Sequence, residues 1–185
     1  MSLPKIRFLV LAVSVGLLFI ATAFADVPFD RFHSSAPLDG EVFVLVNTCS
    51  GRCLAIQNGL KCRGANVVQG ALPASAGAGE RWKIVKTDNY FKLINENSGL
   101  VLAVPEASRL QGQQIVQWDD SGTEDQQWEF VKIGHHYSVK SRVSGLVLGV
   151  SESRKDDAAP VVQWQLAEIP DQVWLIQWVP GLGKR

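Results

Sequence analysis

Three tryptophans recur along the chain at a constant spacing of 46 residues. Each one ends a three-residue motif: Glu80-Arg81-Trp82, Gln126-Gln127-Trp128 and Gln172-Val173-Trp174. The same spacing separates Trp118 from Trp164, so the second and third copies are in register. In the first copy Ser50-Gly51 lies 48 residues before Ser98-Gly99, which indicates two extra residues in a loop before Trp82. Self-similarity of this kind predicts three copies of one supersecondary unit.

Each copy is expected to contain four short β-strands. In the second copy, strand-forming residues at 90–94, 101–104, 114–118 and 127–131 are separated by turn sequences such as Asn97-Ser98-Gly99. The third copy repeats the pattern at 137–140, 147–150, 161–164 and 173–178. Beyond the N-terminal segment no sustained apolar stripe with helical period is present. The sequence therefore predicts an all-β protein of about twelve strands, closed around a pseudo-threefold axis.

The N-terminus has the features of a secretory signal. Lys5 and Arg7 precede an apolar run at 8–24, and Ala23-Phe24-Ala25 supplies a small-x-small cleavage site. We predict a signal peptide at 1–25, an N-terminal extension at 26–41, and a secreted or periplasmic protein without a membrane span after cleavage. An uncleaved anchor is the alternative, because a 17-residue run is at the short edge of a membrane span.

The composition argues against several classes of function. Loss of Lys5 and Arg7 with the signal leaves 16 basic against 18 acidic side chains, a charge of about −2. A nucleic-acid binder is therefore not expected, because the chain lacks a basic stripe. No phosphate loop, nucleophile elbow or metal-binding helix is recognisable, and the repeats occupy most of the chain. We expect a protein that is not an enzyme and needs no cofactor or metal.

The three cysteines, Cys49, Cys53 and Cys62, all lie in the first copy. In an exported protein at most one intramolecular disulfide can form among them, and the sequence leaves all three pairings open. The remaining thiol would be buried or would link the chain to a partner, including a second copy in a disulfide-linked dimer. Metal binding is less favoured, because neither a fourth cysteine nor a suitably spaced histidine accompanies them.

The repeats resemble those of the ricin-B-type β-trefoil lectins, which end in Gln-x-Trp and carry an internal Ser-Gly-x-x-Leu turn and strand. The fullest copy here contains Asn97-Ser98-Gly99-Leu100-Val101-Leu102 and ends in Asp125-Gln126-Gln127-Trp128. The resemblance implies a β-trefoil at 42–179, with repeats at 42–88, 89–134 and 135–179 and a C-terminal tail at 180–185. It also implies non-catalytic carbohydrate binding in shallow pockets, so the expected partners are glycans or polysaccharides.

The resemblance assigns roles to residues of the second and third repeats. Trp118 and Trp164 fall at the aromatic platform on which a sugar ring stacks. Asp125 and Asp171 fall at the polar position before Gln-x-Trp, and Gln126 and Gln172 are expected to share binding with fixing the turn. Regular alternation of β-strands leaves open a second interpretation, in which Trp118 shares the face of Val116 and covers the core. Trp82, Trp128 and Trp174 are expected to be core anchors, each burying about 150–250 Å².

The chain also departs from the family pattern. The Asp that follows the second-strand Leu is replaced by Ala55, Ala103 and Gly149, and the Gln two positions before the platform by Val68, Val116 and Val162. Repeat one has Gly70 at the platform and Gly79-Glu80 in place of Asp-Gln, so we expect it to be structural only. Two alternatives to a lectin follow: a trefoil protein-interaction scaffold that has lost sugar binding and, less favoured, a trefoil protease inhibitor.

Overall fold

The computed structural model describes residues 39–71 and 79–179. In these residues the chain forms twelve strands and no α-helix. No helix there is long and apolar enough to cross a membrane. The predicted signal at 1–25, most of the extension at 26–41 and the tail at 180–185 lie outside the described residues.

The strands fall into three groups of four along the chain. The first group is β1 (Val42–Asn47), β2 (Cys53–Ile56), β3 (Val67–Gly70) and β4 (Trp82–Thr87). The second is β5 (Tyr90–Asn95), β6 (Val101–Ala103), β7 (Val116–Trp118) and β8 (Trp128–Ile133). The third is β9 (His136–Ser141), β10 (Val147–Val150), β11 (Val161–Trp164) and β12 (Trp174–Trp178). Short 3₁₀ segments lie at Gln57–Gly59, Pro105–Ala107, Glu124–Gln126, Ser151–Ser153 and Pro170–Gln172.

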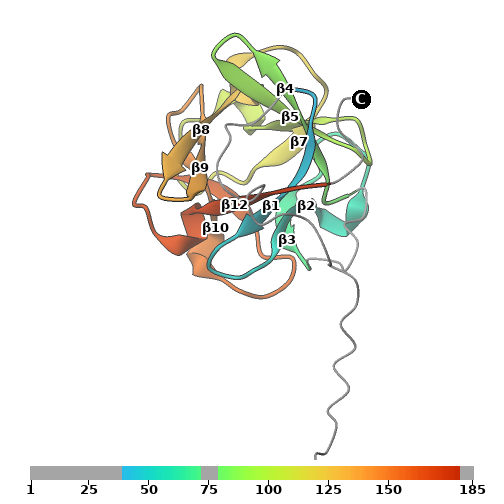
Figure 1. Cartoon of the computed structure of the whole chain (residues 1–185). Helices are drawn as coiled ribbons and strands as arrows, with labels where there is room; N and C mark the ends of the chain where they lie inside the picture. The colour runs from blue at the N-terminus through green and yellow to red at the C-terminus, as the bar shows by residue number, and fades with distance from the viewer. Residues whose placement is uncertain (1–38, 72–78, 180–185) are drawn as a thin grey trace, which may run out of the picture.

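Six strands close into an antiparallel barrel, in which β1 pairs with β4, β4 with β5, β5 with β8, β8 with β9, β9 with β12, and β12 with β1. The first and fourth strand of each repeat therefore lie in the barrel wall, as Figure 1 allows the reader to follow. Closure leaves this wall without an unpaired edge strand. The architecture is the predicted all-β trefoil with three similar four-stranded repeats.

The remaining strands form three hairpins, β2–β3, β6–β7 and β10–β11. Single bridges join the hairpins in a triangle: Asn66 to Val116, Gln114 to Val162, and Val68 to Pro160. The side-chain Nε2 of Gln114 adds hydrogen bonds to the carbonyls of Val67, at 2.7 Å, and Val161, at 2.9 Å. Each hairpin is thus held by both neighbouring repeats, and the loops beside the hairpins meet across repeat boundaries.

Trp82, Trp128 and Trp174 are fully buried in one core cluster. Each begins the fourth strand of its repeat and donates its indole N–H to a second-strand carbonyl, that of Leu54 (2.9 Å), Leu102 (3.0 Å) or Leu148 (3.2 Å). A buried indole N–H needs such an acceptor. The repeated tryptophan therefore ties the last strand of each repeat to its hairpin.

The structure narrows the position of the two-residue insertion. Cys53 faces Gly70 in the first hairpin, as Val101 faces Trp118 in the second, so the 48-residue offset persists as far as Gly70. The offset has returned to 46 at Gly79, whose carbonyl accepts from Asn95 as that of Asp171 accepts from Asn47. The extra residues therefore lie between Gly70 and Gly79, in the connection from β3 to β4.

All three cysteines are free thiols in the structure, which therefore contains none of the three possible pairings. Cys53 is buried in β2, where its thiol donates toward the carbonyls of Gly70 and Ala71. Burial, reinforced by the negative charge of Glu80, raises the pKa of the Cys53 thiol to about 12. Cys49 is half-buried and Cys62 is exposed. Cys53 is therefore a packed, protonated thiol, and Cys62 is the most accessible of the three.

The last residue of the first strand is a buried asparagine in repeats one and two but a serine in repeat three, where hydrogen bonds are lost. Asn47 and Asn95 each hold the following turn, accepting from two backbone N–H groups and donating to the carbonyl of Asp171 or Gly79. The equivalent residue of repeat three is Ser141, whose buried Oγ has no hydrogen-bond partner among the described residues.

Replacing Ser141 with asparagine is expected to raise the free energy of unfolding by about 1 kcal/mol, because the longer side chain reaches the Asp125 carbonyl and the turn amides. Urea unfolding of Ser141→Asn measures the effect. The reverse change, Asn95→Ser, should lower stability by a similar amount. A destabilised Ser141→Asn variant would show that the third repeat has no room for the amide.

Candidate functional site: a pocket over Trp164

Two tryptophans stand at the outer ends of the hairpins with their rings in contact with solvent. Trp118 ends β7 and is 46% exposed, and Trp164 ends β11 and is 47% exposed. Trp118 does share a strand face with Val116, but this face is turned away from the core: Ile115 belongs to the core cluster and Val116 does not, and the equivalent Val162 lines a pocket together with Trp164. Both predicted platforms are therefore open to a ligand.

Each exposed ring rests on a glycine of the preceding repeat. A Cβ atom on Gly112 would lie 3.1 Å from Cζ3 of Trp164, and one on Gly64 would lie 3.3 Å from Cζ3 of Trp118. Both glycines have positive φ, +78° and +73°. At the equivalent position of repeat three stands Ala158, which bonds to the carbonyl of Gln69 beside the ringless Gly70. We call Gly64 and Gly112 the glycine seats of Trp118 and Trp164. The position is glycine in the two places where a tryptophan ring packs on it.

Replacing Gly112 with alanine is expected to tilt Trp164 off its seat and to weaken ligand binding in repeat three by about tenfold, or about 1.4 kcal/mol. The positive φ adds a stability cost of about 1 kcal/mol. Gly51→Ala is the matched control, because Gly51 has φ +69° with nothing within 4 Å of its Cβ position and lies in the repeat without a platform. Calorimetric titration of both variants separates the effects, and equal affinities would contradict the role of the seat.

The residue before each platform fixes the neighbouring loop. Gln69, Gln117 and Gln163 are fully buried. The amide of Gln163 donates to the carbonyls of Ser108 and Leu110, both at 2.9 Å, and its oxygen accepts from Ser144. Gln117 and Gln69 make the same bonds to loops 60–62 and 154–156. We did not predict these residues, although their recurrence in all three repeats, even beside Gly70, was a usable signal.

Gln126 and Gln172 each make hydrogen bonds that hold the loop after the platform tryptophan. Both are 1% exposed. Gln172 donates to the Gln165 carbonyl at 2.8 Å and accepts from the Ala167 N–H at 2.7 Å. Gln126 likewise donates to the Asp119 carbonyl and accepts from the Ser121 N–H. Their amides are therefore occupied in holding the loop that follows the platform. Each amide has one further N–H and one further oxygen lone pair beyond these two bonds.

Asp171 is the polar group that this loop presents to the pocket. The residue as a whole is only 8% exposed, and its carboxylate has no hydrogen-bond or ion-pair partner among the described residues. Its backbone carbonyl is held by Asn47 at 2.8 Å. Neither carboxylate oxygen is among the buried, unsatisfied atoms of the described residues, so both reach the solvent of the pocket and can accept hydrogen bonds from a bound molecule. The equivalent Asp125 in repeat two is half-buried.

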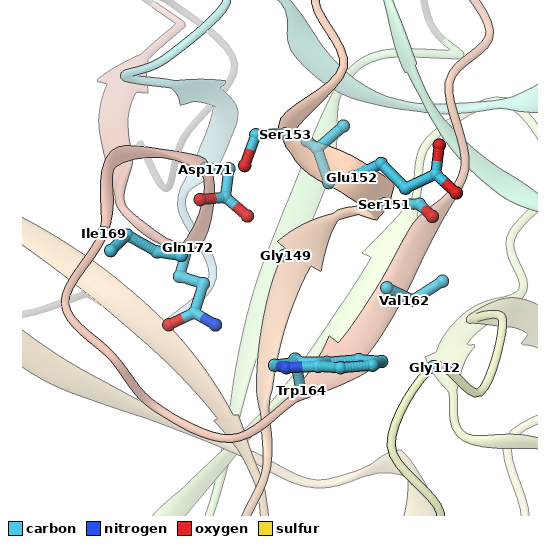
Figure 2. A pocket seen from close by; sticks show the side chains of 11 residues that line it. Gly112, Gly149, Ser151, Glu152, Ser153, Val162, Trp164, Ile169, Asp171 and Gln172 are labelled. Carbon is cyan, nitrogen blue, oxygen red and sulfur yellow. The ribbon is translucent and has the colours of Figure 1, made fainter.

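Trp164 and Asp171 meet in a pocket of about 390 Å³ in repeat three. Gly149 forms part of the lining, and so does the turn that carries Ser151, Glu152 and Ser153. Figure 2 shows the indole of Trp164 along one side, with Asp171 and Glu152 on opposite sides of the space beyond the ring. An aromatic face, two carboxylates and two hydroxyls thus surround one open volume.

Gly149 contributes to this pocket by being small. A Cβ atom there would lie 3.2 Å from Cγ of Gln172 and 3.7 Å from Oδ2 of Asp171. The residue that departs from the family pattern therefore leaves room beside the Asp171 carboxylate. In repeat two the same position is Ala103, and Pro105 and Ala107 replace the two serines. Repeat two keeps the ring and the acids but has fewer hydroxyls.

Repeat one lacks the parts of such a site. Gly70 provides no ring, and a Cβ atom added there would lie 3.0 Å from that of Ala55. Gly79 provides no carboxylate. The structure thus brings Trp164, Asp171 and Gln172 together in one pocket, between the turn of repeat three and Gly112 of the preceding repeat. For repeat two it shows the exposed Trp118 ring in contact with the Gly64 position.

Comparison with known proteins places this geometry in context. A family model described as ricin-type beta-trefoil lectin domain-like matches residues 30–118 and 78–164. No curated protein matches the chain. The designed threefold-symmetric protein ThreeFoil shares 33% identity with a TM-score of 0.71, over 75% of this chain and 99% of that one.

Two further solved structures have the same fold. An exo-beta-1,3-galactanase from Clostridium thermocellum has a TM-score of 0.73 at 28% identity, and the match covers 79% of this chain but 32% of the enzyme. The ricin B-like lectin of Macrolepiota procera, solved in complex with lactose, has a TM-score of 0.67 over 77% of this chain and 99% of that one. Its identity of 16% makes it evidence for the fold alone.

Proposed function

The chain belongs to the ricin-type β-trefoil lectin-like family, and from that premise we propose that it is an exported, non-catalytic carbohydrate-binding protein whose principal site is the pocket over Trp164. A second, less enclosed site lies over Trp118 in repeat two. Repeat one has a structural role.

The observation that carries this proposal is the pairing of the half-exposed Trp164 ring with Asp171, a largely buried residue whose carboxylate has no protein partner among the described residues and opens to the same pocket. A pyranose ring has one face of C–H groups and a rim of hydroxyls. The C–H face packs on an indole, while a carboxylate accepts hydrogen bonds from two neighbouring hydroxyls. The hydroxyls of Ser151 and Ser153 provide both donors and acceptors beside it.

Affinity at one such site is expected to be low. An open pocket with one aromatic face corresponds to a Kd of about 1 mM, or about −4 kcal/mol. Two sites on one rigid barrel raise retention on a polymer or a glycan-coated surface, because the second contact forms at high effective concentration. The proposed ligand is therefore a repeating or densely displayed glycan.

The test is a glycan array probed with the protein in multivalent form, so that single-site affinities in the millimolar range become visible. Binding that a free sugar competes away supports the proposal and identifies the ligand class. Absence of binding by folded protein would contradict it and favour the interaction scaffold. The export proposal is tested separately, by a mature N-terminus at Asp26 in the secreted protein.

A further inference from the structure

The turn after the second strand of each repeat has an unusual backbone conformation. A hydrogen bond closes each turn, from Leu60 N to Gln57 O, Ser108 N to Pro105 O and Arg154 N to Ser151 O, at 3.1–3.2 Å. The two central residues have positive φ in all three: Asn58 and Gly59 at 54° and 62°, Glu106 and Ala107 at 54° and 51°, Glu152 and Ser153 at 55° and 51°. These are type I′ turns.

Asn-Gly is the pair that a type I′ turn prefers, and repeat one has it. Repeats two and three have Glu-Ala and Glu-Ser instead, although a left-handed backbone is unfavourable for such residues. The turn itself does not account for glutamate in both. A residue that opposes its local backbone preference in two copies indicates a requirement outside the turn.

The glutamates occur in the same repeats as the other parts of the site. Repeat three has Glu152, Trp164 and Asp171, and repeat two has the equivalent Glu106, Trp118 and Asp125. In repeat one the three positions are Asn58, Gly70 and Gly79. The platform ring, the aspartate before the Gln-x-Trp motif and the turn glutamate are therefore present together or lost together.

The charge of the pocket in repeat three is entirely negative. Glu152 and Asp171 are its two ionisable lining residues, and no basic side chain lines it. Glu152 forms no ion pair among the described residues, and the nearby Arg154 is bonded to Asp156. Asp171 and the turn that carries Glu152 lie on different sides of the space beyond the ring, and the exposed Glu152 side chain, which extends outward in Figure 2, can rotate toward a cation bound there. The ring face also attracts positive charge.

Resting on the proposed function, we propose that the pocket binds an amino sugar with a free ammonium group, and that Glu152 contacts this group. The Trp164 face carries the C–H side of the ring. Asp171 accepts from hydroxyls near the ammonium. Glu106 has the same role in repeat two. There Arg63, the neighbour of Gly64 in the chain, forms an ion pair with Asp119 at 2.5 Å. The positive charge of Arg63 disfavours an ammonium group, which makes repeat two the weaker site.

The probes are beads that display glucose or galactose in three forms, with hydroxyl, acetamido or amino at carbon 2. At pH ~6 the amine is charged, since the pKa of an ordinary α-amino group is about 7.7. We expect the amino form of at least one hexose to be retained at least about tenfold more strongly than its acetamido and hydroxyl forms. Beads that carry an amine without a sugar should not be retained.

Two variants assign the preference to the turn acid. Glu152→Gln should reduce retention of the amino form about tenfold and leave the other forms unchanged. Glu129→Gln on β8 changes the net charge equally, away from the pocket, and should have no effect. The pair Glu152→Asn with Ser153→Gly gives repeat three the Asn-Gly turn of repeat one, and should raise Tm while losing the preference.

The outcomes separate this inference from the proposed function. Stronger retention of the acetamido or hydroxyl forms, unaffected by Glu152→Gln, would overturn the inference and leave a lectin for neutral sugars. Equal retention on sugar-free amine beads would reduce the effect to bulk charge and would also overturn it. Retention of no sugar in any form would overturn both.

Discussion

The double variant Trp118→Ala with Trp164→Ala is expected to lose glycan retention, by about a hundredfold or more, with little change in stability. Each alanine removes the surface on which a sugar ring packs, and losing about tenfold at each of two sites multiplies on a multivalent ligand. Both rings are about half exposed, so the fold loses little packing, and the free energy of unfolding should change by less than about 1 kcal/mol.

Affinity chromatography on the retained glycan measures the loss, and thermal unfolding checks the fold. The single variants rank the sites: Trp164→Ala should reduce retention more than Trp118→Ala, because the third repeat adds the hydroxyls of Ser151 and Ser153. Unfolding of the double variant would refute the platform assignment, since the rings would then be holding the barrel. Undiminished retention would place the binding surface elsewhere.

Replacing Trp128 with alanine is expected to have the largest effect on stability, about 3–5 kcal/mol. This side chain has no exposed surface and packs in the core cluster that spans all three repeats. Its loss leaves a cavity too large for the barrel to collapse around, and it leaves the Leu102 carbonyl without its 3.0 Å donor. For a domain of this size such a loss is a large part of the total stability.

Guanidinium unfolding of Trp128→Ala measures the loss, with Trp118→Ala as the matched control. The two variants remove the same side chain from the same repeat, one from the core and one from the surface. Equal destabilisation would contradict the division into anchors and platforms. Trp128→Phe should recover part of the loss, because it restores ring volume but not the indole N–H.

The architecture was predictable because the repeat is a property of the sequence itself. The spacing of Trp82, Trp128 and Trp174 and the alternating short strands predicted an all-β protein of about twelve strands in three copies, the family resemblance implied a β-trefoil, and the structure has both. Which strands pair with one another in the barrel wall could not be predicted from the repeat pattern alone. Strand pairing depends on contacts between distant repeats, such as Phe43 with Trp178, which no local pattern specifies.

The candidate site was predictable only in part, because its geometry depends on what lies beside each residue. Trp118 and Trp164 were assigned by resemblance, while the alternation of strands allowed the opposite orientation. The glycine seat was not foreseen, since Gly112 is 52 residues before the ring that it supports. None of the disulfides that the cysteine count allowed is formed in the structure, where Cys53 is packed as a thiol.

The geometry of the pocket gives a physical reason for the missing second-strand Asp of repeat three. The missing second-strand Asp leaves Gly149, whose small size makes room beside Asp171. The turn that follows supplies Glu152 from the other side. The acids of the site are thus placed differently from those implied by the resemblance, which is the reason to expect a different sugar preference.

The most direct test of the account is an NMR titration that follows the six tryptophan indole N–H signals with the sugar that best competes in the array. The Trp164 signal, identified by its loss in Trp164→Phe, should shift first and saturate in the millimolar range, followed by that of Trp118. The signals of Trp82, Trp128 and Trp174 should stay in place. Saturable shifts confined to other tryptophans, with Trp164 unmoved, would contradict a sugar site over that ring.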